Sequence, residues 1–340
     1  MNILKELSDN YVKVDSNLFS SGVKGYWSNL NKGENEILLS SIKTMSSEDA
    51  IKKYQPLLYD VIFSPKRAGG LELLNLSGDE TCVDYGCMWG ALTVPLARRC
   101  KYVLGVDQTM DSLRFLKARV DEESMCNVHL LCCDLRTMLT FKNKFDIAIV
   151  NGVLEWIPEQ GEIELKSHYA QQKVKEYSGN PREQQVQFLK KVYENLCRNG
   201  KIYLAIENRY DYKMFFGVKD PHSGLLLTSI VPRRVANMIS MHELGRPYVN
   251  WTYSIKDIER MLMQSGFSKV DLYMCFPDYR CPEKILPYRS ALNNYKPVMA
   301  YPSGKRSFRK ILGIAIEKII FKYCKMRFLC PSIIAIGEKC

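Results

Sequence analysis

Several features that would assign the chain to a common class of protein are scarce or missing. No apolar run comes near the roughly 18 residues that a membrane-spanning helix needs. Lys5, Glu6 and Asp9 interrupt the first residues, so the apolar core of a secretion signal is missing. We therefore expect a cytoplasmic protein. With 340 residues, of which 46% are hydrophobic, the chain is large enough for a packed core, and global disorder is excluded.

The spacing of cysteine and histidine provides no ligand set. Twelve cysteines are present, but none are spaced as C-x-x-C, and the four histidines are scattered. Cys82, Cys132 and Cys275 lie inside apolar runs. This pattern favours buried free thiols in a reducing compartment over disulfides or a zinc site. We accordingly expect no bound metal.

From residue 81 onward, apolar runs rich in β-forming residues alternate with helical segments. The predicted strands cover residues 81–86, 102–107, 128–134, 145–151, 201–208, 270–276 and 332–339. Such alternation predicts an α/β fold with a mostly parallel, doubly wound sheet. Ser254 is the expected N-cap of a helix that ends near Gly266.

Two levels of organisation are predicted. Residues 1–75 are interpreted as a helical N-terminal extension or lid, and residues 76–340 as the main domain. Segments 208–252 and 277–331 interrupt the alternation of strands and helices. Long connections in compact domains are usually functional, so we interpret both as insertions that shape a substrate site or a docking surface.

Residues 83–90, VDYGCMWG, join the first strand to a helix. Gly86 and Gly90 allow the backbone to approach a ligand and a packed helix. Asp107 ends the next strand, where a carboxylate can accept hydrogen bonds from both ribose hydroxyls. Together these signals predict nucleoside binding, although a tight turn and a solvated aspartate would explain each alone. Met88 breaks the G-x-G-x-x-G pattern, which disfavours NAD, and the missing G-x-x-x-x-G-K-[ST] excludes a P-loop.

Polar residues also follow the next two strands. Asp134 could hydrogen-bond an adenine amino group, and Leu135 could contact the ring. Asn151 ends the fourth strand and is followed by residues 152–158. The carboxyl ends of neighbouring parallel strands meet at one edge, where open α/β sheets bind ligands.

On these residues the chain resembles the class I S-adenosylmethionine-dependent methyltransferases, over roughly residues 80–275 and the last strand. The resemblance implies a Rossmann-like, seven-stranded sheet with an antiparallel last strand, and S-adenosyl-L-methionine as cofactor. The loop after the first strand would hold the methionine moiety, and the acids after the second and third strands would bind ribose and adenine. The cofactor-binding residues implied are Asp84, Gly86, Gly90, Asp107, Gln108, Asp134, Leu135, Asn151 and Glu155. Met88 stands where the family usually has the middle glycine of its loop.

A narrower resemblance rests on the order of five sequence blocks. These are NGVLEWIP, AIENRYDYKMFFGVKDPHSG, VPRRVANM, YVNWTYS and FPDYRCP. They are similar to blocks of a bacterial methyltransferase group associated with surface-glycan synthesis. The resemblance implies O-methylation of a glycan or glycan precursor in polysaccharide biosynthesis.

Three residues are candidates for catalysis, because a hydroxyl acceptor can need a base and every acceptor needs alignment. His222 is the first choice, since a neutral imidazole accepts a proton near pH 7; a structural histidine in a turn is the alternative. Asp220 could orient the imidazole or act as base itself. Glu207 ends the fifth strand, where an ion pair with Arg209 or Arg233 is the alternative to catalysis.

Residues 305–327 carry eight basic side chains and one acidic one, Glu317, in a chain of net charge +11. Apolar residues recur among them at helical spacing. A basic amphipathic helix predicts peripheral contact with an anionic membrane at its inner face; packing over the sheet edge or against a second subunit is the alternative. RNA, lipid or quinone methylation and a non-catalytic, cofactor-binding role remain open as alternatives to glycan methylation.

Overall fold

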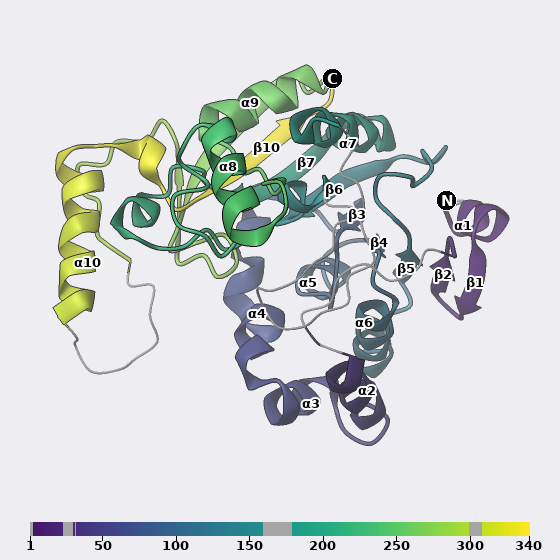
Figure 1. Ribbon diagram of the computed structural model, residues 1–340. Coiled ribbons are helices and arrows are strands. Elements are labelled where there is room, and N and C mark those ends of the chain that lie inside the picture. The colour runs from purple at the N-terminus through teal and green to yellow at the C-terminus, as the bar shows by residue number, and fades with distance from the viewer. Residues whose placement is uncertain (1–2, 23–29, 31, 159–178, 299–307) are drawn as a thin grey trace.

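One mixed sheet of ten strands runs through the computed structural model, which describes residues 3–22, 30, 32–158, 179–298 and 308–340 (Figure 1). In order across the sheet, the strands are β1 (Val12–Asp15), β2 (Leu18–Ser20), β5 (Val128–Cys132), β4 (Tyr102–Asp107), β3 (Thr81–Tyr85), β6 (Phe145–Asn151), β7 (Leu196–Glu207), β10 (Ser332–Glu338), β8 (Lys269–Phe276) and β9 (Lys284–Pro287). The strands from β2 to β7 are parallel to their neighbours, and β1, β10, β8 and β9 pair antiparallel. This is a Rossmann-like, mostly parallel α/β arrangement.

The expected count of seven strands is wrong, because three short strands extend the sheet at its two edges. The seven expected strands are its central part, from β5 to β8, and β10 is antiparallel to both neighbours as expected. β1 and β2 add one edge, and β9 adds the other. The side chains of β1 are all exposed and β2 has three residues, so neither shows the apolar alternation that marks a strand in a sequence.

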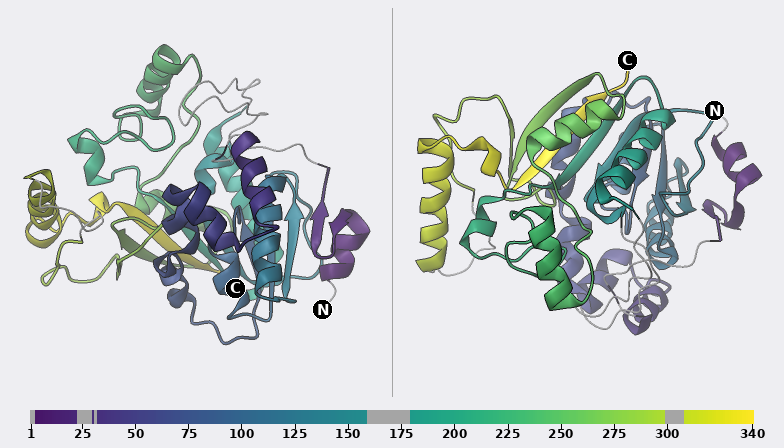
Figure 2. Two further views of the ribbon diagram at one scale, coloured as in Figure 1. Left: turned by 90° about the horizontal axis from the view of Figure 1, so that it is seen from below. Right: turned by 45° about the horizontal axis from the view of Figure 1, so that its top comes forward.

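Helices cover both faces of the sheet (Figures 1 and 2). One face packs against α1 (Ile3–Asn10), α7 (Pro181–Asn195) and α9 (Ile255–Gln264). The other face packs against η2 (Pro65–Leu74), α5 (Thr93–Ala97) and α6 (Met110–Glu122). α9 begins as predicted, because the Ser254 hydroxyl accepts a hydrogen bond from the Asp257 amide over 3.2 Å.

The N-terminal segment contains helices and also contributes β1 and β2 to the sheet. α2 (Lys32–Ser41), α3 (Ser47–Tyr54) and α4 (Tyr59–Phe63) lie near α6, at the lower side of Figure 1. Their apolar side chains form a separate core with Trp89 and Phe115. The segment is thus attached to the main domain at the sheet edge through β2, at α6 through α2 and α3, and at one face of the sheet through η2.

Segments 208–252 and 277–331, which interrupt the alternation of strands and helices, contain short helices and strands of their own. The first contains η4 (Tyr212–Phe216) and α8 (Arg233–Leu244). The second contains β9, α10 (Phe308–Lys318), the π-helical turn η5 (Ile319–Tyr323) and η6 (Arg327–Leu329), which project at one side of the molecule (Figure 1). Among the helices of the described residues, none combines the length and apolar character that crossing a bilayer requires.

Candidate functional site

A pocket opens where β3, β4, β5 and β6 end, at the carboxyl edge of the parallel part of the sheet. It encloses about 680 Å³ of space that is continuous with solvent. Its lining residues are Gly86, Met88, Asp107, Gln108, Thr109, Asp134, Leu135, Arg136, Gly152, Val153, Trp156 and Ile157. The structure therefore brings together Gly86, Asp107, Gln108, Asp134 and Leu135, all predicted to bind the cofactor.

The loop after β3 requires glycine at two positions. Gly86 has a φ of +72°, and a Cβ there would overlap the neighbouring side chain of Val153, which also lines the pocket. Gly90 has a φ of +78°, and a Cβ there would overlap Leu116 of α6. Gly86 borders the pocket, whereas Gly90 is not among the lining residues. The structure gives Gly90 a packing function, the close contact between the loop and α6, and its contact with a cofactor stays a prediction.

Asp107 is buried at the end of β4, and backbone amides hold both of its carboxylate oxygens. The amide of Met88 donates to Oδ2 over 2.9 Å, and the amide of Thr109 donates to Oδ1 over 2.8 Å. Burial raises the pKa of Asp107, and these hydrogen bonds counteract the rise. A carboxylate oxygen accepts more than one hydrogen bond, so both oxygens keep capacity for hydroxyl donors in the pocket.

Asp134 shares the pocket with an arginine that the sequence analysis does not include. The guanidinium of Arg136 lies 2.6 Å from Oδ2 of Asp134, and the Arg136 amide donates to Oδ1 over 2.9 Å. Both side chains line the pocket. This part of the wall thus presents a charge-neutral pair of polar side chains.

Asp84 and Asn151 are not among the lining residues. Asp84 is buried in β3, where its Oδ2 accepts a hydrogen bond from the Thr93 hydroxyl over 2.7 Å. Burial raises the pKa of Asp84 to about 7, although the Thr93 hydrogen bond acts in the opposite direction. Asn151 ends β6 opposite Ala205 of β7. Their predicted roles in cofactor binding stay predictions.

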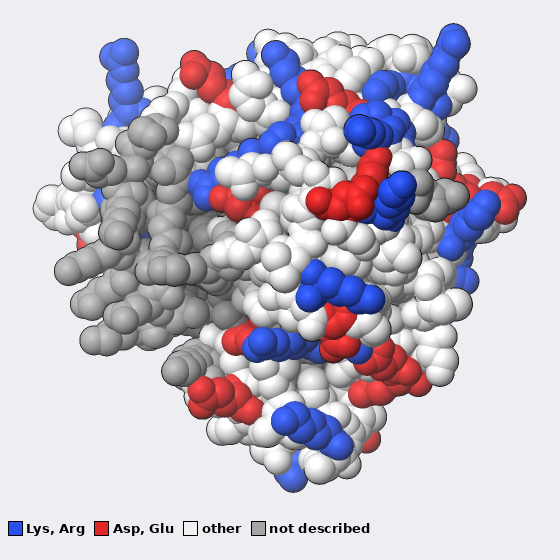
Figure 3. All heavy atoms as spheres, turned by 90° about the vertical axis from the view of Figure 1, so that its right-hand side faces the viewer, with Lys and Arg blue, Asp and Glu red and all other residues white. Residues whose placement is uncertain are grey.

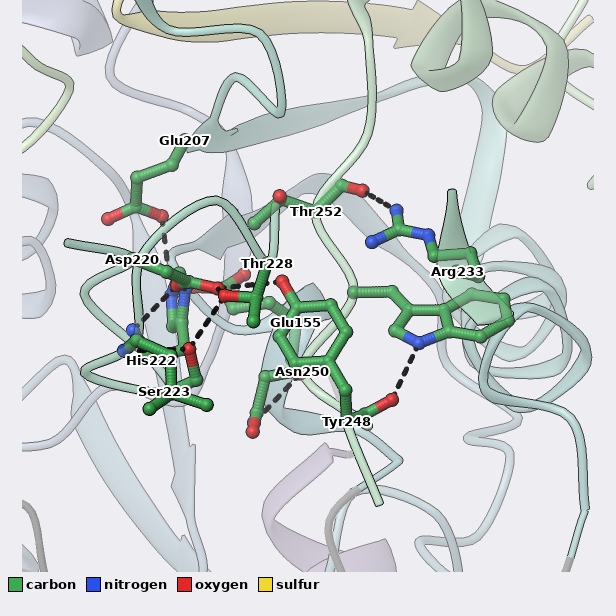
Figure 4. A network of polar contacts seen from close by, with 12 residues as sticks. Glu155, Glu207, Asp220, His222, Ser223, Thr228, Arg233, Tyr248, Asn250 and Thr252 are labelled. Carbon is green, nitrogen blue, oxygen red and sulfur yellow. Dashed lines mark hydrogen bonds and ion pairs between the residues drawn. The ribbon is translucent and has the colours of Figure 1, made fainter. Parts of the chain in front are cut away.

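Beside the pocket, Glu155, Glu207 and His222 face one another (Figure 4). Glu155 lies in η3 (Leu154–Trp156), Glu207 ends β7, and His222 lies in the loop between η4 and α8. His222 Nε2 is 3.6 Å from Glu155 Oε1 and 3.6 Å from Glu207 Oε2. The ring of Trp156, which lines the pocket, has its centroid 5.3 Å from that of the imidazole. The three side chains and the pocket therefore share the Trp156 wall, and Glu155 faces His222 rather than the pocket predicted for it.

Asp220 holds His222 from the other side. Its Oδ1 accepts from the His222 amide over 2.9 Å and lies 3.1 Å from His222 Nδ1. Its Oδ2 accepts from the hydroxyls of Tyr248 over 2.7 Å and Thr228 over 3.1 Å. Burial alone would raise the pKa of Asp220, but the contacts with His222 and Tyr248 lower it to about 2. Asp220 is thus fixed as a carboxylate that orients the imidazole.

The carboxylates determine the charge of His222. Burial disfavours the imidazolium, but Glu207, Asp220 and Glu155 outweigh burial and hold the pKa of His222 well above its usual range. An imidazolium donates from both nitrogens and cannot accept a proton. The structure thus brings the three predicted catalytic residues together beside the pocket, but as a positive imidazole between carboxylates. Their roles in catalysis stay predictions.

The alternative ion pairs for Glu207 are not formed. Arg209 donates to the carbonyl oxygens of Ser229 and Val231, over 2.7 and 2.6 Å. Arg233 donates to the carbonyl oxygen of Thr252 (Figure 4). Within the described residues, neither guanidinium pairs with Glu207, whose Oε2 is buried without a hydrogen-bond partner.

More than half of the pocket wall was not assigned residue by residue to cofactor binding in the sequence analysis. The lining residues without such an individual assignment are Met88, Thr109, Arg136, Gly152, Val153, Trp156 and Ile157. Gly152 could have been recognised from the sequence, because a glycine directly after a buried strand often marks a place where another group packs closely against the backbone. In the structure, a Cβ at Gly152 would overlap Tyr279. The apolar lining residues carried no signal of this kind, since an apolar residue in a pocket wall and one in the core look alike in a sequence.

The segment that lines this pocket is similar to known proteins. Residues 82–171 match a family model described as a methyltransferase domain. Over 86 residues, the chain is 30% identical to a protein of Methanocaldococcus jannaschii described as a probable cobalt-precorrin-6B C(15)-methyltransferase (decarboxylating). This match covers 25% of the chain and 46% of the relative, so the chain spans less than half the length of the curated relatives that it matches.

Solved structures of methyltransferases are similar as well. Phosphoethanolamine N-methyltransferase 2 of Haemonchus contortus, in complex with phosphomonomethylethanolamine and S-adenosylhomocysteine, matches at 14% identity over 87% of this chain and 58% of that one, with a TM-score of 0.47. The N-methyltransferase NodS of Bradyrhizobium japonicum matches at 12% identity over 82% of this chain and 98% of that one, with a TM-score of 0.41.

Proposed function

We propose that this chain is an S-adenosylmethionine-dependent methyltransferase. The observation that carries the proposal is the pocket at the ends of β3, β4, β5 and β6, built almost entirely from the segment that matches a methyltransferase domain. Its polar groups lie at the ends of successive parallel strands, as recognition of a nucleoside requires.

The pocket residues fit the chemical groups of S-adenosylmethionine. Asp107 keeps lone pairs on two fixed oxygens for the two ribose hydroxyls. Leu135, Trp156 and Ile157 offer apolar contact to a purine ring, and Asp134 with Arg136 offers polar contact to its edge. Gly86 allows the loop after β3 to pack directly against Val153 at the pocket wall. When bound, the sulfonium supplies an electrophilic methyl group, and the chain's own residues orient the acceptor.

For the acceptor, we propose a hydroxyl of a glycan or glycan precursor in polysaccharide synthesis. Its support is the order of the five sequence blocks, which resembles that of a glycan-associated group. Hydroxyl methylation also suits the carboxylates beside Trp156, because a hydroxyl nucleophile must lose its proton during transfer. On the face drawn in Figure 3, basic and acidic side chains are interspersed, whereas a nucleic-acid-binding face gathers basic ones.

A second surface supports peripheral contact with an anionic membrane. Ile320 and Phe321 of η5 are buried against the core, while Leu312, Ile319 and Tyr323 are exposed. Lys318 and Lys325, also exposed, lie among them, so this part of the surface combines apolar and basic side chains. The first basic residues of the predicted helix, Lys305 and Arg306, lie outside the described residues.

Calorimetric titration with S-adenosylmethionine tests the proposed function. The wild-type protein is expected to bind with micromolar affinity, and Asp107→Ala at least tenfold more weakly, because the ribose would lose a charged acceptor worth about 1.5–3 kcal/mol. Asp111→Ala removes a more exposed aspartate from the neighbouring helix α6 and should bind like the wild type. Folded wild-type protein that does not bind the cofactor would refute the proposal. Binding without methyl transfer to glycan, lipid or RNA acceptors would favour a non-catalytic role.

A further inference from the structure

We propose that Glu155, Glu207 and His222 bind a divalent metal ion next to the pocket. One ligand atom from each residue can be chosen so that all three lie within 4.8 Å of one another. The two separations of 3.6 Å from His222 Nε2 are too long for good hydrogen bonds. They match two ligands of one ion, because metal–ligand bonds of about 2.0–2.2 Å at tetrahedral angles place ligand atoms about 3.3–3.6 Å apart.

The two glutamates are left without hydrogen bonds at their facing oxygens. Glu155 is 0% exposed, and neither of its carboxylate oxygens has a hydrogen-bond partner among the described residues. Oε2 of Glu207 is buried and unpartnered in the same way. Buried charged groups are costly unless they are paired or coordinate a metal. One imidazolium can offset only one of the three carboxylate charges of Glu155, Glu207 and Asp220, so a divalent cation at the point the oxygens face would improve the charge balance.

The contacts of His222 are those of a metal ligand. Its Nδ1 faces Oδ1 of Asp220 at 3.1 Å, which directs Nε2 toward the two glutamates. A carboxylate at one imidazole nitrogen, with the metal at the other, is the usual outer support of a histidine ligand. Asp220 is itself held by the hydroxyls of Tyr248 and Thr228 (Figure 4). The orientation of the imidazole is therefore set before any ion binds.

Glu155, Glu207 and His222 would not fill every coordination position of the ion. Three protein ligands leave at least one coordination position for water or substrate. Trp156 lines the pocket, and its ring lies 5.3 Å from the imidazole of His222, measured between centroids, so the site adjoins the pocket. Resting on the proposed function, the ion would bind the acceptor hydroxyl and lower its pKa, so that the hydroxyl proton could pass to water. The oxygen would then take the methyl group as its bond to the sulfonium sulfur breaks, and no neutral histidine base would be needed.

The chemistry of the donors limits the choice of ion. One imidazole and two carboxylates suit Zn²⁺ or Mn²⁺, and none of the twelve cysteines belongs to the group. The sequence analysis expects no metal because it relies on ligand spacing. Glu155 and Glu207 lie 52 residues apart in the chain. They meet only because η3 follows β6, Glu207 ends β7, and these two strands are parallel neighbours in the sheet.

Mn²⁺ is the better probe, because thiols prefer softer ions and Cys126, Cys324 and Cys340 are exposed. The experiment titrates metal-free, full-length protein with Mn²⁺ and follows free Mn²⁺ by electron paramagnetic resonance. One ion per chain is expected for the wild type, and at least 30-fold weaker binding for Glu207→Gln, which keeps the size of the side chain. Thermal melting with and without Mn²⁺ shows that the variant is folded and should show a metal-dependent rise in Tm for the wild type alone.

Glu243→Gln is the matched control. His242 and Glu243 form a similar pair, 3.1 Å apart, on the exposed surface of α8, and the variant should bind Mn²⁺ like the wild type. Two results would overturn the proposal: wild-type protein that leaves all Mn²⁺ free, or Glu207→Gln that binds as tightly as the wild type. Titration with S-adenosylmethionine in the presence of a chelator separates the two proposals, since cofactor binding without metal would preserve the proposed function alone.

Discussion

The backbone amide of Met88 donates a hydrogen bond to the carboxylate of Asp107 over 2.9 Å. This contact joins the loop after β3 to the end of β4, so the shape of the loop and the position of the acid depend on each other. Met88 has a φ of +43°, in the left-handed region that glycine adopts most readily. A methionine therefore takes a glycine-like conformation at the wall of the pocket, and its side chain packs toward the core formed with Trp89.

The strain at Met88 can be measured by comparing two substitutions. Both Met88→Gly and Met88→Ala remove the side chain, but only glycine adopts a φ of +43° without cost. We expect the glycine variant to be more stable than the alanine variant by about 1 kcal/mol in urea unfolding. Met263, exposed in α9, is the control: there alanine should be more stable than glycine by about 1 kcal/mol. Alanine equal to or better than glycine at position 88 would contradict the expectation.

Gly90→Ala should destabilise the fold more than a glycine substitution elsewhere with similar backbone geometry. At Gly90 both the φ of +78° and the overlap with Leu116 oppose a Cβ, and we expect a loss of about 2–4 kcal/mol. Gly217 has a φ of +81° and open space around it, so Gly217→Ala should cost only about 1–2 kcal/mol. Equal losses in chemical unfolding would show that Leu116 yields and that Gly90 is not needed for packing.

The raised pKa of Asp84 predicts a pH-dependent stability. The folded state holds this pKa at about 7 against 3.8 for the free group, so the folded state binds the proton more tightly. Ionising Asp84 in the folded protein therefore lowers the free energy of unfolding. This loss is absent below about pH 4, grows as the pH rises, and is complete above about pH 7. Asp84→Asn should therefore gain stability over the wild type across this range, by at most about 4 kcal/mol.

Urea unfolding at a series of pH values measures this difference, because the other titrating groups are common to both proteins. Asp111→Asn, a change at a more exposed aspartate, should keep a constant offset from the wild type. A constant offset for Asp84→Asn would mean that the buried carboxyl does not titrate in this window.

Membrane contact should depend on exposed apolar residues near α10. Sedimentation with vesicles that contain anionic lipid is expected for the wild type, with about tenfold weaker binding for Ile319→Ser, because a half-exposed isoleucine loses its insertion energy. Leu57→Ser changes a more exposed leucine near α3 and should leave binding unchanged. If both variants sediment like the wild type, the surface near α10 does not contact the membrane.

The central sheet and half of the pocket could be predicted because their signals are local. The strand ending at Asp107, the glycines of the loop and the N-cap at Ser254 each depend on neighbours in the sequence. The sequence analysis names His222, Asp220 and Glu207 as candidates for catalysis, but the cluster that His222 and Glu207 form with Glu155 could not be predicted in this way. Its ligands come from η3, β7 and a long loop, and only the three-dimensional fold shows that Glu155 faces His222 rather than the pocket.

The position of β10 has a consequence for synthesis on the ribosome. β7 and β8 are translated first, yet β10 pairs with both and lies between them. Until residues 332–338 emerge, the strand that joins β7 to β8 is missing, and the backbone edges with which these two strands pair to β10 remain open to pairing with other chains. A nascent chain stalled before residue 332 would present two such edges at once. Such chains are expected to depend on chaperones or to be degraded, even though every residue of the nucleoside pocket has already been made.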